Sequence, residues 1–86
     1  MTTEQALQKL TDVIRRKHFA LATEQSYRRW LRRYSDYIKG LTVHLSSEQK
    51  LERFLTVLAH DNVAASTQNQ AFNAIIFFTR RRWVLN

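Results

Sequence analysis

Arginine and lysine side chains gather in three short clusters of this 86-residue sequence. The chain holds 14 Lys and Arg against seven Asp and Glu, which gives a formal net charge of +7 and a pI near 10.6. Guanidinium groups pair well with phosphate oxygens, so this balance favours a polyanionic partner, chiefly nucleic acid. The alternative is that each cluster is an ordinary solvated helix face. The clusters are Arg15-Arg16-Lys17, Arg28-Arg29 with Arg32-Arg33, and Arg80-Arg81-Arg82.

An uncharged segment precedes the last of these clusters. From Asn62 through Thr79 there is no Lys, Arg, Asp or Glu, yet hydroxyl and amide side chains recur at helical spacing. Asn, Ser and Thr form helices less readily than Lys or Glu, whereas the amides of Asn and Gln match the donor and acceptor pattern of adenine edges. We therefore expect DNA contact here, with polar caps and surface as the alternative. The candidates are Ser66, Thr67, Gln68, Asn69, Gln70 and Asn73, followed by Arg80 and Arg81.

Other chemistry has little support in the sequence. His18, His44 and His60 lie at unrelated spacings, and the chain has no cysteine, so we expect no metal site and no cofactor. No nucleophile motif, carboxylate pair or glycine-rich phosphate loop is present, so we expect no catalytic residue. No segment has the pattern of a signal peptide or a membrane span, which favours a cytoplasmic protein.

The apolar spacing predicts an all-α fold of four helices, at about 3–17, 24–39, 47–60 and 66–83. Thr2 with Gln5 and Ser46 with Gln49 have the spacing of capping boxes, while Thr23 and Ser66 are expected to cap the second and fourth helices. Gly40 is expected to end the second helix as its C′ residue. Trp30 and Tyr34 have the phase of core residues, and no internal repeat is apparent.

Three stretches resemble the N-terminal core-binding domain of tyrosine recombinases, and integron integrases most closely. They are "TEQSYRRWLRRYSDY", "FLTVLA" and "VAASTQNQAFNAIIFF", and the resemblance extends over about residues 7–80. It implies an orthogonal SAM-like bundle that forms half of a clamp around duplex DNA, with its second and fourth helices at the major groove. By this resemblance, the segments around Lys17–His18 and Thr23–Gln25 meet the DNA backbone. Arg28, Arg29 and Arg32 lie on the second helix, and Ser66, Thr67, Gln68, Gln70 and Asn73 open the fourth.

The resemblance also bounds what this chain does alone. Family members cut DNA with a tyrosine of a C-terminal catalytic domain, so residues 1–86 are expected to be a single-domain fragment without cleaving or joining activity. Tyr27, Tyr34 and Tyr37 fit core or helix-surface positions instead. We expect a monomer whose parent protein oligomerises on DNA, near the nucleoid of a prokaryotic cell. A helical protein-interaction module remains the alternative, and the target sequence and the choice between duplex and folded single strand stay open.

Overall fold

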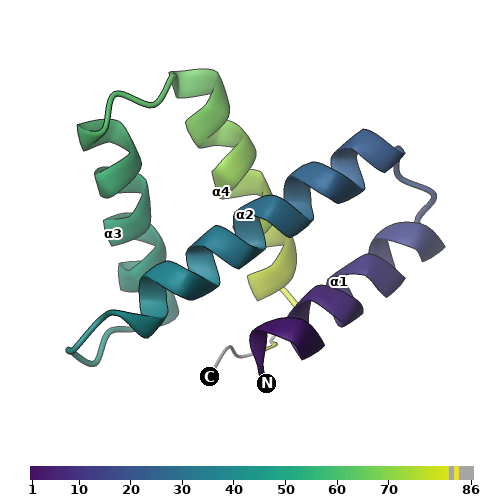
Figure 1. Cartoon of the computed structure of the whole chain (residues 1–86), viewed down its shortest axis with the longest axis horizontal. Coiled ribbons are helices and arrows are strands. Elements are labelled where there is room, and N and C mark those ends of the chain that lie inside the picture. Colours follow the sequence, from purple (N-terminus) through teal and green to yellow (C-terminus); the bar gives the residue numbers. More distant parts are fainter. Residues whose placement is uncertain (82, 84–86) are drawn as a thin grey trace.

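A computed structural model describes residues 1–81 and 83 of the chain. Four helices follow one another, and no strand occurs among these residues: α1 (Thr3–Arg16), α2 (Leu21–Lys39), α3 (Ser47–His60) and α4 (Ala65–Thr79). The all-α, four-helix prediction is confirmed. Figure 1 shows α1 and α2 running side by side as one helical hairpin, and α3 and α4 as another.

Both hairpins begin with the same capping box. The hydroxyl of Thr2 accepts a hydrogen bond from the backbone N–H of Gln5, and the side chain of Gln5 accepts one from the N–H of Thr2. Ser46 and Gln49 repeat this arrangement at the start of α3. Each box pairs donors that a helix start otherwise leaves unsatisfied. Both predicted capping boxes are therefore confirmed.

Both hairpins also turn in the same way. His18 (φ 57°) follows α1 and Asn62 (φ 61°) follows α3, each in the left-handed region. The next residue in each turn donates its N–H back into the helix, Phe19 to the carbonyl of Ile14 (3.2 Å) and Val63 to that of Leu58 (3.0 Å). This is the Schellman arrangement, in which a left-handed residue closes the last helical carbonyls.

The chain is therefore built from one helical hairpin used twice, a repeat that the sequence did not reveal. Counterparts keep one constant offset along the chain, but only scattered positions are identical, which hides the repeat from inspection. Pairs of equal or similar residues are Thr2 and Ser46, Glu4 and Glu48, Gln5 and Gln49, Leu7 and Leu51, Val13 and Val57, Ala20 and Ala64, and Thr23 and Thr67.

Three predicted helix ends were wrong. The N-caps of α2 and α4 are Ala20 and Ala64, which have no side-chain acceptor, so Thr23 and Ser66 lie inside the first turns and cap nothing. Helix α4 ends at Thr79, with Arg80 as its C-cap, rather than near residue 83. Position 82 of the third basic cluster lies outside the described residues.

Helix α2 ends at Lys39 as predicted, but Gly40 does not have the predicted conformation. Gly40 is the C-cap of α2 with φ −82°, so it is not a left-handed C′ residue. Its N–H donates to the carbonyl of Tyr37 at 3.1 Å, which continues the right-handed turn.

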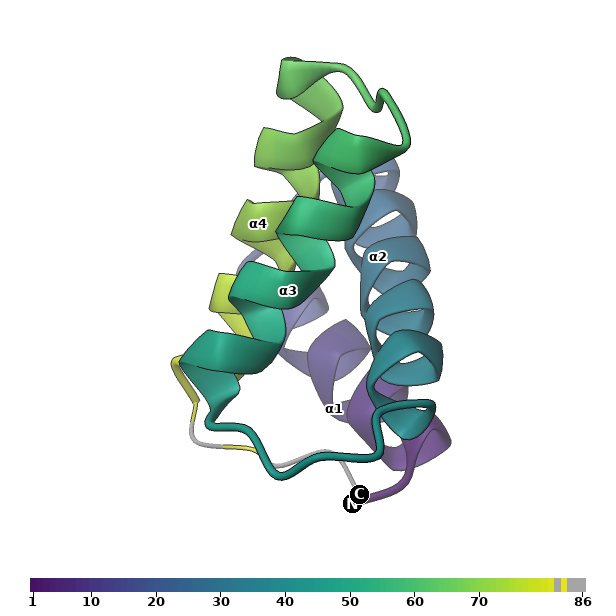
Figure 2. The ribbon, with the colours of Figure 1, turned by 90° about the vertical axis from the view of Figure 1, so that its left-hand side faces the viewer.

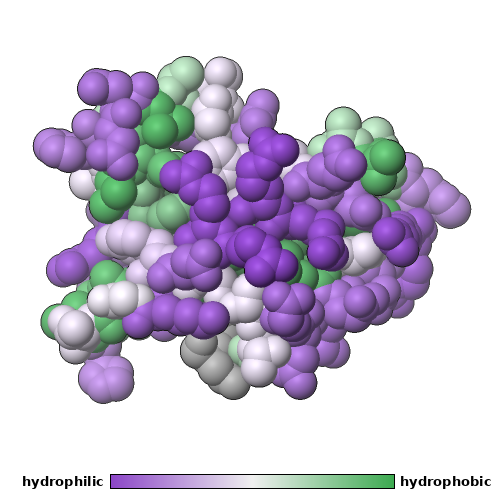
Figure 3. Space-filling model, viewed as in Figure 1, coloured by the Kyte–Doolittle hydropathy of each residue, from purple (hydrophilic) through white to green (hydrophobic). Residues whose placement is uncertain are grey.

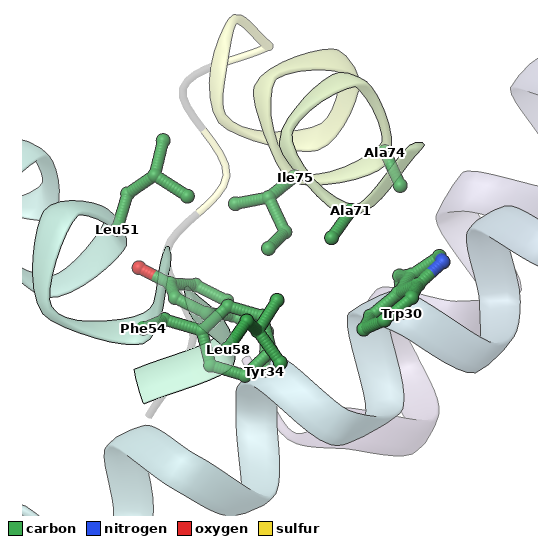
Figure 4. Close-up of a cluster of buried hydrophobic side chains, with 8 residues drawn as sticks. All are labelled: Trp30, Tyr34, Leu51, Phe54, Leu58, Ala71, Ala74 and Ile75. Carbon is green, nitrogen blue, oxygen red and sulfur yellow. The ribbon is translucent and has the colours of Figure 1, made fainter. Parts of the chain in front are cut away.

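The two hairpins pack across each other, mainly through α2 and α4 (Figures 1 and 2). Ala71 and Ala74 are fully buried there, and such small side chains let the two helices approach closely. Around them, residues from α2, α3 and α4 form one core cluster (Figure 4): Trp30, Tyr34, Leu51, Phe54, Leu58, Ala71, Ala74 and Ile75. A second cluster joins α1 to α2 and α4: Ala6, Leu7, Leu10, Ile14, Leu31 and Phe78.

The core placement of Trp30 and Tyr34 is confirmed. Phe54 stands at the centre of the first cluster, with ring centroids 5.4 Å from Tyr34 and 6.4 Å from Trp30. Burial raises the pKa of the Tyr34 phenol to about 12, because the charged form would lose its hydration. Tyr34 thus stays neutral in the physiological range and acts as a packing residue.

Candidate nucleic-acid interface

A polar groove lies between the N-terminal halves of α2 and α4. It brings together five of the residues selected from the sequence, three on α2 and two on α4. None of its lining residues is acidic. The lining consists of Ala22, Thr23, Gln25, Ser26, Tyr27, Arg29, Gln70 and Asn73, and we call this set the polar groove.

An apolar hollow continues the polar groove toward the end of α4. The groove and the hollow share Tyr27 and Asn73. Their volumes are similar, about 530 Å³ and 670 Å³, and they differ in the residues that line them. Five aromatic and aliphatic side chains line the hollow together with three cations and one amide. Its lining is Lys17, Phe19, Tyr27, Phe72, Asn73, Ile76, Phe77, Arg80 and Arg81.

Phe77 organises the apolar hollow. Its ring lies 5.4 Å from that of Tyr27 and 5.6 Å from that of Phe19. The guanidinium of Arg81 lies over the same ring at 3.8 Å and donates to the carbonyl oxygen of Phe77. These contacts orient Arg81 along the end of α4, while Arg80 is exposed beside it.

The four arginines of α2 have different surroundings, although the sequence indicated one common face. Arg28 is half-buried, donates to the hydroxyl of Thr11 and lies 3.5 Å from the carbonyl oxygen of Leu7, so it is tied to α1. Arg32 pairs with Glu4 at 3.3 Å. Arg33 lies over the ring of Trp30, 4.9 Å from its centroid.

Arg29 differs from the other three. It is exposed, and it makes no hydrogen bond, ion pair or ring contact with any residue in the described part of the chain. It lines the polar groove, where no acidic residue is present to pair with it. Arg33 also makes no hydrogen bond with the described residues, but it is stacked on Trp30 and does not line the groove, so Arg29 is the groove arginine with its whole fork of donors open to a ligand.

The residues of the first basic cluster, Arg15-Arg16-Lys17, also differ in their surroundings. Arg15 donates to the Glu24 carboxylate at 2.9 Å and joins α1 to α2, and this hydrogen bond, followed by the charge of Glu24, raises the pKa of Arg15. Lys17 is exposed and reaches the apolar hollow. His18 is exposed in the turn and lines neither depression.

The first turns of α4 are less uniform than the sequence indicated. Gln68 donates to the carbonyl oxygen of Val63 at 2.8 Å, so its amide stabilises the turn before the helix. Thr67 is half-buried, while Ser66 and Asn69 are exposed, and none of the three lines the groove. The helix start has neither a side-chain cap nor an acidic residue, which leaves its N–H groups and positive dipole end suited to an anion.

The surface agrees with this distribution. In Figure 3, strongly hydrophilic side chains gather over α2 at the centre of the view. A smaller hydrophobic patch lies at the N-terminal end of α2 in the same view. Leu21, the first residue of α2, is 66% exposed. The polar side of α2 therefore faces solvent, as a nucleic-acid surface requires.

Sequence reasoning missed several lining residues. Ser26 and Ala22 lie on the groove side of α2, about one and two helical turns before Arg29, and Phe19 and Phe72 form part of the hollow. The hairpin repeat is the signal that would have found Ser26, because Ser26 is the counterpart of Gln70. The exposed aromatic rings have no comparable signal, since their phase on the helices resembles that of core residues.

Two further classes of site lack support in the described part of the chain. No three His, Cys, Asp or Glu side chains among residues 1–81 and 83 gather closely enough to hold a metal ion. Within the same residues, every helix is too short or too polar to cross a bilayer.

Comparisons with known proteins agree with the fold. The family model described as phage integrase, N-terminal SAM-like domain, matches residues 6–85. Two curated relatives named integrase/recombinase, from Escherichia coli and Pseudomonas aeruginosa, are each 34% identical over 73 residues. These alignments cover 84% of this chain and 22% of each relative, so the chain spans less than a quarter of their length. No solved structure matches. The match over most of its length shows that the chain belongs to the phage integrase N-terminal SAM-like domain family.

Proposed function

We propose that the chain is the DNA-binding module of a site-specific tyrosine recombinase, and that it lays the α2–α4 face against DNA. The observation that carries this proposal is the polar groove, which unites a free guanidinium on α2 with carboxamides on α4. The net charge of +7 and the family membership support the same partner. The relatives' name, integrase/recombinase, supports recombination as the process.

The proposal distinguishes contacts to the sugar–phosphate backbone from contacts to the bases. Cations at the edges hold the sugar–phosphate backbone, and the groove meets the base edges. Lys17 and Arg80 are exposed at one end of the face, and Arg32 lies along α2. The uncapped start of α4 adds backbone N–H groups, so Ser66, Thr67 and Asn69 are assigned to phosphate or sugar rather than to bases.

No catalytic role is proposed for residues 1–86. The tyrosine nucleophile and the arginines that assist it belong, by the family resemblance, to a separate domain of a parent recombinase that oligomerises on DNA. The isolated module is proposed to be a monomer in the cytoplasm, near the nucleoid. A clamp made of two linked domains gains affinity from the linkage, so the module alone binds more weakly than its parent.

Salt-dependent binding tests the proposal. Six phosphate contacts give a slope near −5 in a plot of log affinity against log salt, so binding should fall about a thousandfold between 50 and 200 mM salt. Fluorescence anisotropy of a labelled duplex of mixed sequence measures this slope. Absence of binding at 50 mM salt, or an affinity independent of salt, would overturn the proposal.

The integron branch has its own test. If the module belongs to that branch, a folded single strand with unpaired bases should compete better than the fully paired duplex of the same sequence. Equal competition would assign the module to a recombinase that acts on ordinary duplex sites.

A second function has one specific observation in its favour. The apolar hollow leaves Phe72 41% exposed beside Phe77, which suits the docking of another protein. This alternative predicts self-association or a stable protein complex at 1 M salt without DNA, measured by sizing chromatography. A monomer at high salt that binds DNA at low salt favours the first proposal.

A further inference from the structure

We infer that Arg29 and Asn73 form a base-reading pair, in which Arg29 recognises a guanine and Asn73 an adenine on neighbouring base pairs of the recombination site. This inference rests on the proposed function, and it adds the sequence preference of the site and the two side chains that determine it.

Arg29 is distinguished from the other α2 arginines by its freedom. Arg28 is held by Thr11, and Arg32 pairs with Glu4. Arg33 is stacked on Trp30, whereas Arg29 has no partner in the described part of the chain. Arg28 and Arg32 already use donors, and Arg33 keeps its donors but lies outside the polar groove. Arg29 is therefore the groove arginine that can present both donors of one edge to a base.

Asn73 occupies the equivalent place on the other hairpin. The constant offset that pairs Thr2 with Ser46 and Ala20 with Ala64 also pairs Arg29 with Asn73. Both are exposed, and both line the polar groove where α2 and α4 meet. The repeat thus brings a guanidinium from α2 and a carboxamide from α4 to the same groove.

The groove leaves these side chains available. No acid is present in its lining, and the nearest in sequence, Glu24, is engaged by Arg15 at 2.9 Å. Asn73 makes no hydrogen bond with the described residues, in contrast to Gln68, which is bonded to the Val63 carbonyl. Neither member of the pair must give up an internal contact in order to bind.

The chemistry of the pair assigns the bases. A guanidinium donates two parallel hydrogen bonds to O6 and N7 of guanine, and a carboxamide accepts from N6 and donates to N7 of adenine. Both patterns occur in the major groove, which is wide enough to admit a helix. Each such bidentate pair discriminates against the wrong base by about 5- to 150-fold.

Selection from a pool of duplexes with randomised positions tests the inference, with the 86-residue chain as the selecting protein. The unaltered chain should enrich a guanine and a nearby adenine. Arg29→Gln should replace the guanine preference by adenine, because a carboxamide then occupies that place. Asn73→Ala should remove the adenine preference and keep the guanine preference.

A matched control separates the effect on base preference from the effect of removing a positive charge. Arg32→Gln removes the same charge from the same exposed side of α2, so it should lower affinity for all sequences and leave the enriched bases unchanged. In the selected duplex, 7-deazaguanine should weaken binding at least about 5-fold because it lacks N7, whereas inosine keeps O6 and N7 and should bind as guanine does. The circular dichroism spectrum of each variant establishes that it is folded.

The outcomes distinguish the inference from the function on which it rests. Salt-dependent binding without any enriched base, or the same enrichment from Arg29→Gln as from the unaltered chain, overturns the reading pair and leaves the DNA-binding function intact. Failure of the unaltered chain to bind any duplex at 50 mM salt overturns both.

Discussion

The two hairpins share one backbone plan and both bury apolar side chains, but only the first adds polar contacts between its helices among the described residues. In the α1–α2 hairpin, polar contacts cross between the helices: the buried hydroxyls of Thr3 and Ser35 are bonded, Arg28 reaches Thr11, and Arg15 pairs with Glu24. In the α3–α4 hairpin the contact is apolar, through the core cluster around Phe54. Its helices carry no ion pair among the described residues.

This difference determines which side chains each hairpin leaves unengaged at its surface. Two of the four α2 arginines, Arg28 and Arg32, contact α1, so they serve the fold as well as the surface. Helix α4 is held by alanines, Ile75 and Phe78, and its outer side is free to carry uncharged amides. The first hairpin therefore presents charged side chains beside its internal polar contacts, and the second presents uncharged amides, so the repeat can offer two kinds of contact to one ligand.

The largest expected effect is a test of the apolar hairpin. Phe54→Ala should cost about 3–5 kcal/mol, because it removes ring contacts with Trp30, Tyr34 and Tyr37 and leaves a cavity. A domain of this size has only about 5–15 kcal/mol of stability, so the variant should be mostly unfolded or melt far lower. Urea unfolding followed by circular dichroism measures the change.

Leu10→Ala, at the counterpart position in the first hairpin, is the matched variant. It should cost about 2–5 kcal/mol and less than Phe54→Ala, because polar contacts also hold that hairpin. A larger loss for Leu10→Ala would contradict the view that the second hairpin depends more on its core.

The next effect concerns the helix starts. Helices α1 and α3 have capping boxes, whereas α2 and α4 begin with Ala20 and Ala64. Ala64→Asp should stabilise the fold by about 1 kcal/mol through a new cap, but should weaken DNA binding several-fold by placing a carboxylate where phosphate approaches. Urea unfolding and anisotropy at 50 mM salt measure the two effects.

Ala64→Ser is the control for that experiment, since it supplies a cap without a charge. It should stabilise the fold by a similar amount and leave DNA affinity nearly unchanged. If the serine and aspartate variants bind DNA equally well, the start of α4 does not face phosphate.

The helix ends could be predicted from the sequence where the signal lies within a few neighbouring residues. The capping boxes and α3 followed directly from the sequence, because a box is formed within four residues. The starts of α2 and α4 did not, because an alanine N-cap gives no signal and Thr23 and Ser66 have the residue types of caps. The end of α4 was missed because "RRRW" continues an apolar-periodic helix without any stop signal.

Part of the groove lining could be predicted from the sequence, but the internal contacts of its side chains could not. Spacing alone selected Arg29, Gln70 and Asn73, and the structure places all three in one groove. It could not show that Arg28 is tied to Thr11 or that Gln68 is bonded to Val63, because both contacts depend on how the chain turns back on itself. Tertiary partners, rather than residue type, decide which polar side chains remain free.

Substitutions in the turns that follow α1 and α3 should change stability by a smaller amount. His18→Gly should stabilise the chain by about 0.5–1 kcal/mol, because glycine adopts a positive φ without the steric penalty that a histidine side chain carries. Asn62→Gly should gain less, since asparagine tolerates this conformation better. Thermal unfolding of the two variants compares them, and an equal or larger gain for Asn62→Gly would contradict this account of the two turns.

The smallest effect on stability is expected where α2 is charged and exposed. Arg32 and Glu4 pair at 3.3 Å, but their side chains are 52% and 75% exposed, so the pair contributes about 0.2–1 kcal/mol at most. A double-mutant cycle with Arg32→Ala and Glu4→Ala in urea measures this coupling.

A low coupling energy means that DNA can draw Arg32 away from Glu4 at little cost, and Glu4→Ala should then raise DNA affinity slightly by removing a competing carboxylate. A coupling well above about 1 kcal/mol would instead make Arg32 part of what holds the first hairpin, and Glu4→Ala would then destabilise the chain without improving binding.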